Sequence, residues 1–379
     1  MPRKSLKGEN ADSSSSPAVK TPKTPKTASA TPAKDAKTTA SATKATTTAT
    51  PTPASGTKRP RQSKEKKAAI AADARAAARN PFVDFALAQV LSIAIATGGQ
   101  YALGEVTGRE LTALRSSGDV VRDLGVQTAW RFVSLALAWF ANLDSLDAAA
   151  MAFMSTAPGT YLLYNFYAVS PLAALGSLAI DVLAAAVPFH LFRPLSNVHS
   201  KTPGRLYNRE LLTFVSQLHT SAFAVAIYSV TISLALRFYL ARVFVMRFAG
   251  IPSVELAYSA SPISVLPVAA AFGIVASAFL FPSFATTSKT KDDDKIRQFV
   301  PADASLKQTV WWNVWGYTTK TKVLIRRAAL AVVATSVGTY LSSSMSIRGV
   351  EACGSISYAG VWAVATLLTA VGLGVIGSE

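Results

Sequence analysis

Four ionisable side chains stand within or beside long apolar stretches of this chain, and they are its best candidates for chemistry. They are Asp84, Arg131, Asp181 and His219. Such groups are costly in hydrocarbon, so each is by default a functional hypothesis. Asp181 with Arg131, or Asp181 with His219, could form a proton or ion relay. For Asp181 and His219 we favour the simpler alternative, a hydrogen bond between neighbouring helices.

The residue patterns of familiar catalytic and metal sites do not occur in the sequence. It has no Gly-x-Ser-x-Gly elbow, no His-Glu-x-x-His pair and no Gly-x-Gly-Asp segment. His190 and His199 fall at or beyond the end of an apolar stretch and are interpreted as boundary residues. A single cysteine, Cys353, excludes an intramolecular disulfide, and the acidic run 292–294 is too short for a calcium loop. We therefore expect no metal and no cofactor and favour a non-enzymatic protein; a lipid-modifying enzyme stays an alternative, and it would need a catalytic cluster that faces the membrane boundary.

The elements that position these residues are apolar stretches of membrane-spanning length, and the clearest is 211–236. At about 1.5 Å per helical residue, this stretch can cross a hydrocarbon layer of about 30 Å with some tilt. Similar stretches are 82–103, 171–192, 263–285, 328–344 and 358–376. They lack a period-two pattern and are too long for barrel strands, which predicts an all-α fold.

Two further stretches are ambiguous, and they decide the number of crossings. Residues 126–143 carry Arg131, and residues 148–170 contain Pro158 followed by a glycine. Either both cross as a tight pair around Asp144 and Asp147, or both dip in as re-entrant or interfacial helices. The sequence thus predicts, for residues 81–379, a polytopic transmembrane helical bundle with six to eight spans.

A strongly basic arm precedes this membrane domain. Residues 1–80 hold 17 Lys and Arg against 5 Asp and Glu, whereas residues 81–379 hold 21 against 16. Residues 1–62 are rich in Lys, Thr, Ala and Pro and lack aromatic side chains, which predicts a disordered segment. Residues 63–80 are alanine-rich and basic, with Ser63 as a candidate N-cap, and are expected to form a juxtamembrane helix.

The charge of the arm suits acidic partners. It can neutralise the phosphates of nucleic acid or lie against anionic lipid, and a solvated arm that only fixes orientation is the alternative. The expected electrostatic contacts are Lys58, Arg59, Arg61, Lys64, Lys66 and Lys67. Phosphorylation before proline would weaken such contacts, and the candidate sites are Ser16, Thr21, Thr24, Thr31, Thr50 and Thr52.

The distribution of Lys and Arg predicts the orientation. Thirty of them fall on the side of the arm and seven on the other, while Arg131 lies within a candidate span. Both termini are then cytoplasmic or nucleoplasmic, whether or not the ambiguous pair crosses. Segment 301–327 is predicted to be interfacial because indole rings and a basic cluster favour a membrane boundary. Its anchors are Trp311, Trp312, Trp315 and Tyr317.

Small residues predict close helix packing. Ala269, Gly273 and Ala276 form a face that a neighbouring helix can approach, which suits a compact bundle or a homo-oligomer equally.

These features favour a non-enzymatic multi-pass protein of the endoplasmic reticulum or nuclear envelope. The lipid bilayer is its first partner, and its basic arm would contact chromatin, other nucleic acid or anionic lipid. The alternative is a small transporter or channel that uses Asp181 and His219.

Overall fold

The structure is a computed structural model that describes residues 80–114, 120–200, 208–300 and 304–377. Residues 1–79 lie outside this part. The predictions for the disordered arm, for its contact and phosphorylation residues, and for the juxtamembrane helix therefore fall on residues that the structure does not describe. Within the described ranges the chain is helical, with one isolated β-bridge between Phe248 and Val350 and no strand. The predicted all-α helical bundle is confirmed.

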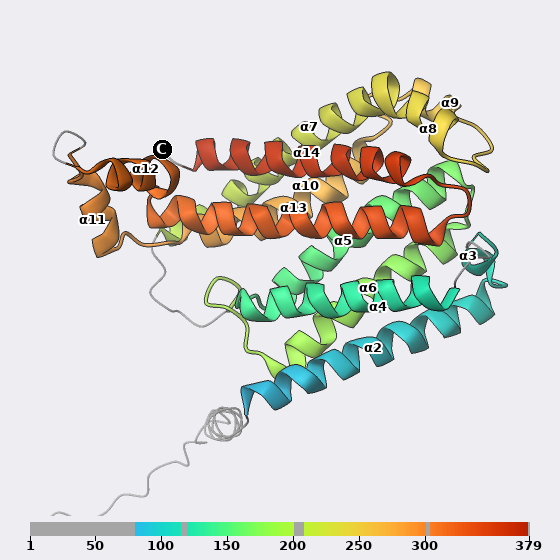
Figure 1. Cartoon of the computed structure of the whole chain (residues 1–379), viewed down its shortest axis with the longest axis horizontal. Coiled ribbons are helices and arrows are strands. Elements are labelled where there is room, and N and C mark those ends of the chain that lie inside the picture. The colour runs from blue at the N-terminus through green and yellow to red at the C-terminus, as the bar shows by residue number, and fades with distance from the viewer. Residues whose placement is uncertain (1–79, 115–119, 201–207, 301–303, 378–379) are drawn as a thin grey trace, which may run out of the picture. The chain divides into compact units, whose positions relative to one another are not determined.

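Eight long helices make up the bundle in the described chain (Figure 1). They are α2 (Pro81–Val106), α4 (Val120–Phe140), α5 (Ser145–Phe166), α6 (Pro171–Phe192), α7 (Phe214–Ala235), α10 (Leu266–Ala285), α13 (Thr319–Ser346) and α14 (Ala352–Ile376). Short helices connect them: α3 (Glu110–Ala113), η1 (Arg209–Leu212), α9 (Glu255–Tyr258), α11 (Lys291–Arg297) and α12 (Leu306–Trp315). After α7 the chain continues through a π-helical turn, η2 (Leu236–Leu240), into α8 (Ala241–Arg247).

Six helical segments of the described chain are long and apolar enough to cross a membrane. They begin at Pro81, Pro171, Phe214, Leu266, Thr319 and Ala352. The predicted multi-pass membrane character is thus confirmed. Helices α4 and α5 fall outside this set but also run along the bundle (Figure 1). The α4–α5 turn lies beside the α6–α7 connection, because Asp144 bonds His199. The structure therefore favours a crossing pair over a re-entrant one.

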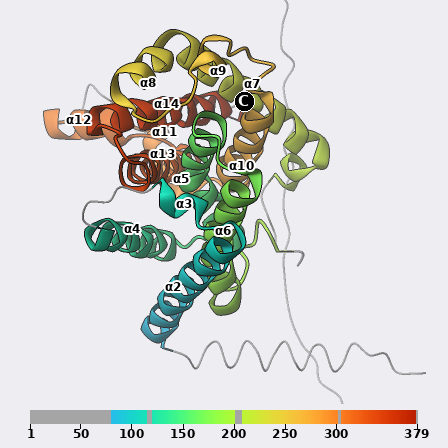
Figure 2. The ribbon, with the colours of Figure 1, turned by 90° about the vertical axis from the view of Figure 1, so that its right-hand side faces the viewer.

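The position of α5 explains why it need not be strongly apolar. It packs against α6, α10 and α13, and Figure 2 shows it surrounded by these helices, with α2 and α4 at the periphery. A helix covered on most sides by protein presents little surface to lipid, so small and polar residues such as Ser155 and Gly159 are tolerated on it.

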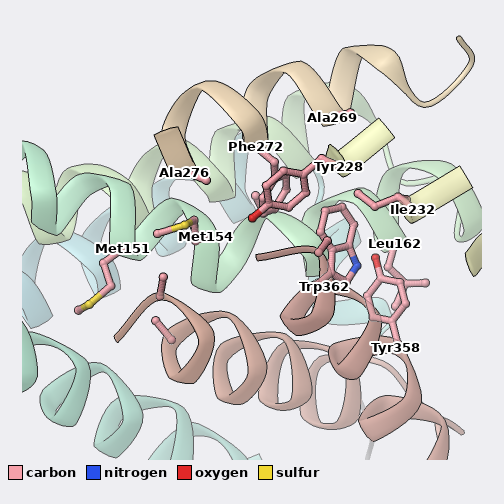
Figure 3. Close-up of a cluster of buried hydrophobic side chains, with 14 of the residues drawn as sticks. Met151, Met154, Leu162, Tyr228, Ile232, Ala269, Phe272, Ala276, Tyr358 and Trp362 are labelled. Atoms are coloured by element: carbon pink, nitrogen blue, oxygen red, sulfur yellow. The ribbon is translucent and has the colours of Figure 1, made fainter. Parts of the chain in front are cut away.

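Aromatic side chains form the centre of the core (Figure 3). Phe272 of α10 packs on Trp362 of α14 with ring centroids 4.4 Å apart. Buried tyrosine hydroxyls find partners across the bundle: Tyr228 pairs with Thr366 at 2.8 Å, and Tyr358 donates to the Pro158 carbonyl at 2.7 Å. These bonds satisfy polar atoms that would otherwise be costly in an apolar interior.

Small residues set the closest helix contacts. A Cβ on Gly273 would lie 2.5 Å from the Val225 backbone nitrogen, and Ala269 and Ala276 beside it are fully buried. The predicted small-residue face is therefore confirmed as the contact between α10 and α7. A second such contact joins α13 to α5, where a Cβ on Gly338 would lie 1.8 Å from the Ser155 Oγ.

The structure divides segment 301–327 differently from the sequence prediction. Helix α13 begins at Thr319, with the Thr318 side chain as its N-cap, so the basic residues 320–327 belong to the long helix. Two of them have partners inside the bundle: Lys320 donates to the Gly377 carbonyl, and Arg327 binds Asp147. The interfacial part of the prediction is thereby restricted to α12 and its flanks.

Candidate functional site

A network of charged and polar side chains lies where α5 begins. Its members, which we call the paired-charge network, are Asp144, Asp147, Ser196, His199 and Arg327. Asp144 is the N-cap of α5, and its Oδ1 accepts a hydrogen bond from the Asp147 backbone nitrogen at 2.9 Å. A carboxylate at this position stabilises the helix through the exposed backbone donors of its first turn.

The second oxygen of Asp144 ties α5 to the connection after α6. It accepts hydrogen bonds from the Ser196 backbone nitrogen at 3.1 Å and the Ser196 hydroxyl at 2.7 Å, and it lies 2.6 Å from the His199 Nδ1. Burial opposes ionisation of Asp144, but the bonds from His199, the Asp147 amide and Ser196 outweigh it and hold its pKa well below the ordinary value. The bond to Asp144 in turn raises the pKa of His199.

Asp147 forms a buried, two-pronged ion pair with Arg327 of α13. The two guanidinium nitrogens lie 2.8 and 2.6 Å from its two oxygens, and the side chains are only 2% and 12% exposed. Arg327 also donates to the Phe279 carbonyl at 2.6 Å and stacks over the Phe279 ring. The pair therefore joins α5, α10 and α13 at one point.

The network also contains a set of side chains that could ligate a metal. One ligand atom each from Asp144, Asp147 and His199 lie within 4.8 Å of one another. However, all four carboxylate oxygens of Asp144 and Asp147 already accept hydrogen bonds from protein donors. As arranged, these residues neutralise each other and fix helix ends.

A cavity of about 940 Å³ adjoins the network. It lies between α5 and α6 on one side and α7 and α10 on the other, and residues 198–200, 210, 212 and 213 border it. Polar side chains line the part nearest the helix ends, namely Asp147, His199, Glu210, Thr213 and Gln217. Apolar side chains line the deeper part, including Phe153, Val182, Ile274 and Val275. Ligand pockets commonly reach about 1,000 Å³, so this cavity can hold a molecule of substantial size.

The structure brings together two of the four predicted intramembrane residues. Arg131 of α4 donates from Nη2 to the Asp181 Oδ1 of α6 at 2.5 Å, and the side chains are 25% and 18% exposed. The observed partner of Asp181 is thus Arg131.

The other two residues lie elsewhere. His219 is exposed on α7, and within the described chain no hydrogen bond or ion pair joins it to Asp181. Asp84 occupies the first turn of α2, near one end of the bundle. In the described chain, Asp181 and His219 are therefore not joined in the relay considered above.

The predicted interfacial anchors lie on and just after α12. Trp311 and Tyr317 are exposed, whereas Trp312 is half-buried. The Trp312 ring stacks on Phe299 with ring centroids 5.1 Å apart, and its Nε1 donates to the Ile296 carbonyl at 3.4 Å. Trp315, at the end of α12, is also half-buried.

Sequence reasoning did not identify the paired-charge network. It placed Asp144 and Asp147 in a turn, His199 at a boundary and Arg327 in a basic connection. The available signal was Asp144 itself, an N-cap type followed three residues later by another carboxylate, directly before a helical stretch. No sequence pattern indicates that Arg327, 180 residues further on, would be the partner of Asp147.

Comparisons with protein-family models, with curated proteins and with solved structures found no match.

Proposed function

We propose that this chain is a non-enzymatic membrane protein of the endoplasmic reticulum or nuclear envelope that holds its basic arm against an acidic surface. The observation that carries the proposal is the charge of residues 1–80, with 17 Lys and Arg against 5 acidic residues, directly before a spanning helix. Tethering to a bilayer raises the local concentration of such an arm at any nearby polyanion.

The described part of the chain supports this proposal through basic residues at the end of the bundle where α2 begins. Arg193 follows α6 there, and Lys320, Lys322 and Arg326 lie in the first turns of α13. Cations at this end would favour the anionic, cytoplasmic face of a membrane, which is also the side on which the arm would emerge.

Helix α12 adds support for a membrane boundary at this end. Its exposed apolar side chains are Leu306, Val310, Trp311 and Val314, whose spacing places them on one face. A short helix with such a face can lie in the headgroup region, and indole rings prefer that depth. The same end of the bundle thus combines basic residues, tryptophans and the start of α2.

The test compares two variants of the full-length protein in nanodiscs of neutral lipid. In the first variant, Lys58, Arg59, Arg61, Lys64, Lys66 and Lys67 are replaced by Gln; in the matched control, the lysines become Arg and the arginines become Lys. We expect wild type and control to bind DNA or anionic vesicles with an affinity that falls steeply with salt, and the Gln variant to bind more weakly with a shallower dependence. Binding that the Gln variant retains in full at every salt concentration contradicts the proposal.

The same experiment separates the two acidic partners. Preference for vesicles of phosphatidylserine over DNA at equal salt assigns the arm to anionic lipid, and the reverse preference assigns it to nucleic acid. Wild-type protein that binds neither excludes both.

A further inference from the structure

We propose that the cavity between α5, α6, α7 and α10 is a binding site for one membrane lipid without net negative charge. Its hydrocarbon part would occupy the deep end, and its polar head would lie beside the paired-charge network. This site is separate from the basic arm and does not depend on the function proposed for it.

The cavity can be reached from the side between α6 and α7. In the described chain, α6 packs mainly against α2 and α5, whereas α7 packs mainly against α10 and α14. Val182 of α6 and Ser221 of α7 nevertheless line the same cavity. Both helices belong to the segments apolar enough to span a membrane, and the lining residue Ile274 on the spanning helix α10 is 53% exposed, so the cavity opens at a surface of the bundle that would face hydrocarbon. The molecules available from that side are lipids.

The cavity extends along the helices by about the depth of one lipid leaflet. Lining residues extend from Thr213, the N-cap of α7, to Ser221 on α7, and from Pro282 back to Ile274 on α10. Each interval is eight residues, or about 12 Å along a helix. That length approaches one leaflet of a hydrocarbon core of about 30 Å. A lipid with its head at the helix ends would therefore have its chain alongside the deep lining.

The lining of the cavity changes from apolar at its deep end to polar at its mouth. The deep wall contains Phe153, Val182, Ile274 and Val275. The hydroxyls between this wall and the mouth already have partners: Ser221 bonds Ser277 at 2.8 Å, and Thr220 donates to carbonyls of its own helix. The inner surface thus offers hydrocarbon contact, and the polar side chains of Glu210, Thr213 and Gln217 lie at the mouth.

The charges at the mouth of the cavity bear on the charge of the lipid headgroup. Of the described basic side chains near the mouth, His199 lines the cavity and bonds Asp144, and Arg327 pairs with the lining residue Asp147. Glu210, which also lines the cavity, forms no ion pair with another residue that the structure describes. Among the residues that the structure describes, an anionic head would meet this carboxylate and no unpaired cation that lines the cavity, so we favour a neutral or zwitterionic head.

The experiment uses full-length protein in liposomes with photoactivatable lipids that carry a diazirine in the acyl chain. Phosphatidylcholine and diacylglycerol probes represent uncharged or zwitterionic heads, and a phosphatidylserine probe represents an anionic one. We expect the first two probes to label peptides from α5, α7 and α10 that line the cavity. Labelling confined to other surfaces would overturn the proposal.

Two substitutions on α10 provide a matched pair. Ala278→Trp places an indole in the cavity, whereas Ala271→Trp adds the same group two turns away, outside the lining. Both alanines are exposed, so both positions can accept the larger side chain. We expect Ala278→Trp to reduce cavity labelling about tenfold and Ala271→Trp to leave it unchanged.

Ile274→Trp fills the deep end from an exposed position and serves as a second test, with thermal unfolding to verify that each variant is folded. Undiminished labelling in both filled variants overturns the cavity as the site. Equal labelling by the phosphatidylserine probe overturns the assignment of the head.

Discussion

Two arginine–aspartate pairs join helices of this bundle, and they do so in opposite settings. Arg327 and Asp147 meet where α13 and α5 are closely packed, in a bidentate pair with almost no exposure. Arg131 and Asp181 reach each other from α4 and α6, and both side chains keep partial exposure. The first pair is part of a packed core, whereas the second holds a peripheral helix to the rest.

Position within an apolar stretch is therefore a poor guide to how much a charge contributes to the stability of the fold. Arg131 and Asp181 stand out in the sequence because apolar residues surround them. Asp147 and Arg327 lie near helix ends, yet they are the more deeply buried pair. Removing one partner of a buried pair leaves an uncompensated charge, so the penalty should follow burial.

The largest effect is expected from Arg327→Leu. It leaves the Asp147 carboxylate buried without its partner, which should lower the free energy of unfolding by about 3–5 kcal/mol. Denaturant titration in mixed micelles measures this value. Arg326→Leu, at the neighbouring exposed position, should change it little, and the double variant Arg327→Leu with Asp147→Leu should recover most of the loss. Equal losses at positions 326 and 327 would contradict the account.

A smaller effect is expected from Gly338→Ala, which tests the close packing of α5 against α13 further along the two helices. The added Cβ would meet the Ser155 Oγ at 1.8 Å and the Ser155 carbonyl oxygen at 2.5 Å, so α5 and α13 must separate. We expect a loss of about 1–3 kcal/mol in the same titration. Gly360→Ala, with no atom within 4 Å of the new Cβ, is the control and should be neutral or slightly stabilising.

Asp181→Asn addresses the peripheral pair. Because the Arg131 and Asp181 side chains are partly exposed, we expect a loss of only about 1–2 kcal/mol. The change should be local, with faster amide hydrogen exchange in α4 and unchanged exchange in α5. Destabilisation of the whole bundle, as large as that of Arg327→Leu, would remove the distinction between the two pairs.

The smallest expected effect is a dependence of the stability of the fold on pH, which arises from Asp144 and His199. The raised pKa of His199 means that its contribution to stability is complete below the ordinary value of 6.5 and is lost as the pH rises through the folded value. The lowered pKa of Asp144 means that its contribution is complete above the ordinary value of 3.8 and is lost as the pH falls. The melting temperature should therefore decline above pH 6.5 in wild type, and His199→Gln should lack this decline. A parallel decline in both proteins would contradict this pairing.

The membrane-spanning helices could be predicted closely because their signal is local. The stretch 171–192 coincides with α6, and the face of Ala269, Gly273 and Ala276 packs as expected. The beginning of α13 could not be placed, because Lys320 and Arg327 are charges that an apolarity criterion assigns to a connection. Their partners, the Gly377 carbonyl and Asp147, are distant in the sequence. Pairing across the bundle is a property of the fold, and so the network and its cavity became visible only in three dimensions.

The most direct test of whether all eight long helices cross the membrane uses two thiols and a membrane-impermeant maleimide in sealed vesicles. The native Cys353 is exposed at the start of α14, and Ala141→Cys, in a Cys353→Ser background, places a thiol in the exposed α4–α5 turn. If α4 and α5 both cross, position 141 reacts from the side on which added protease cleaves the arm. Cys353 then reacts only after permeabilisation. Reaction of both thiols from the same side before permeabilisation would contradict the account.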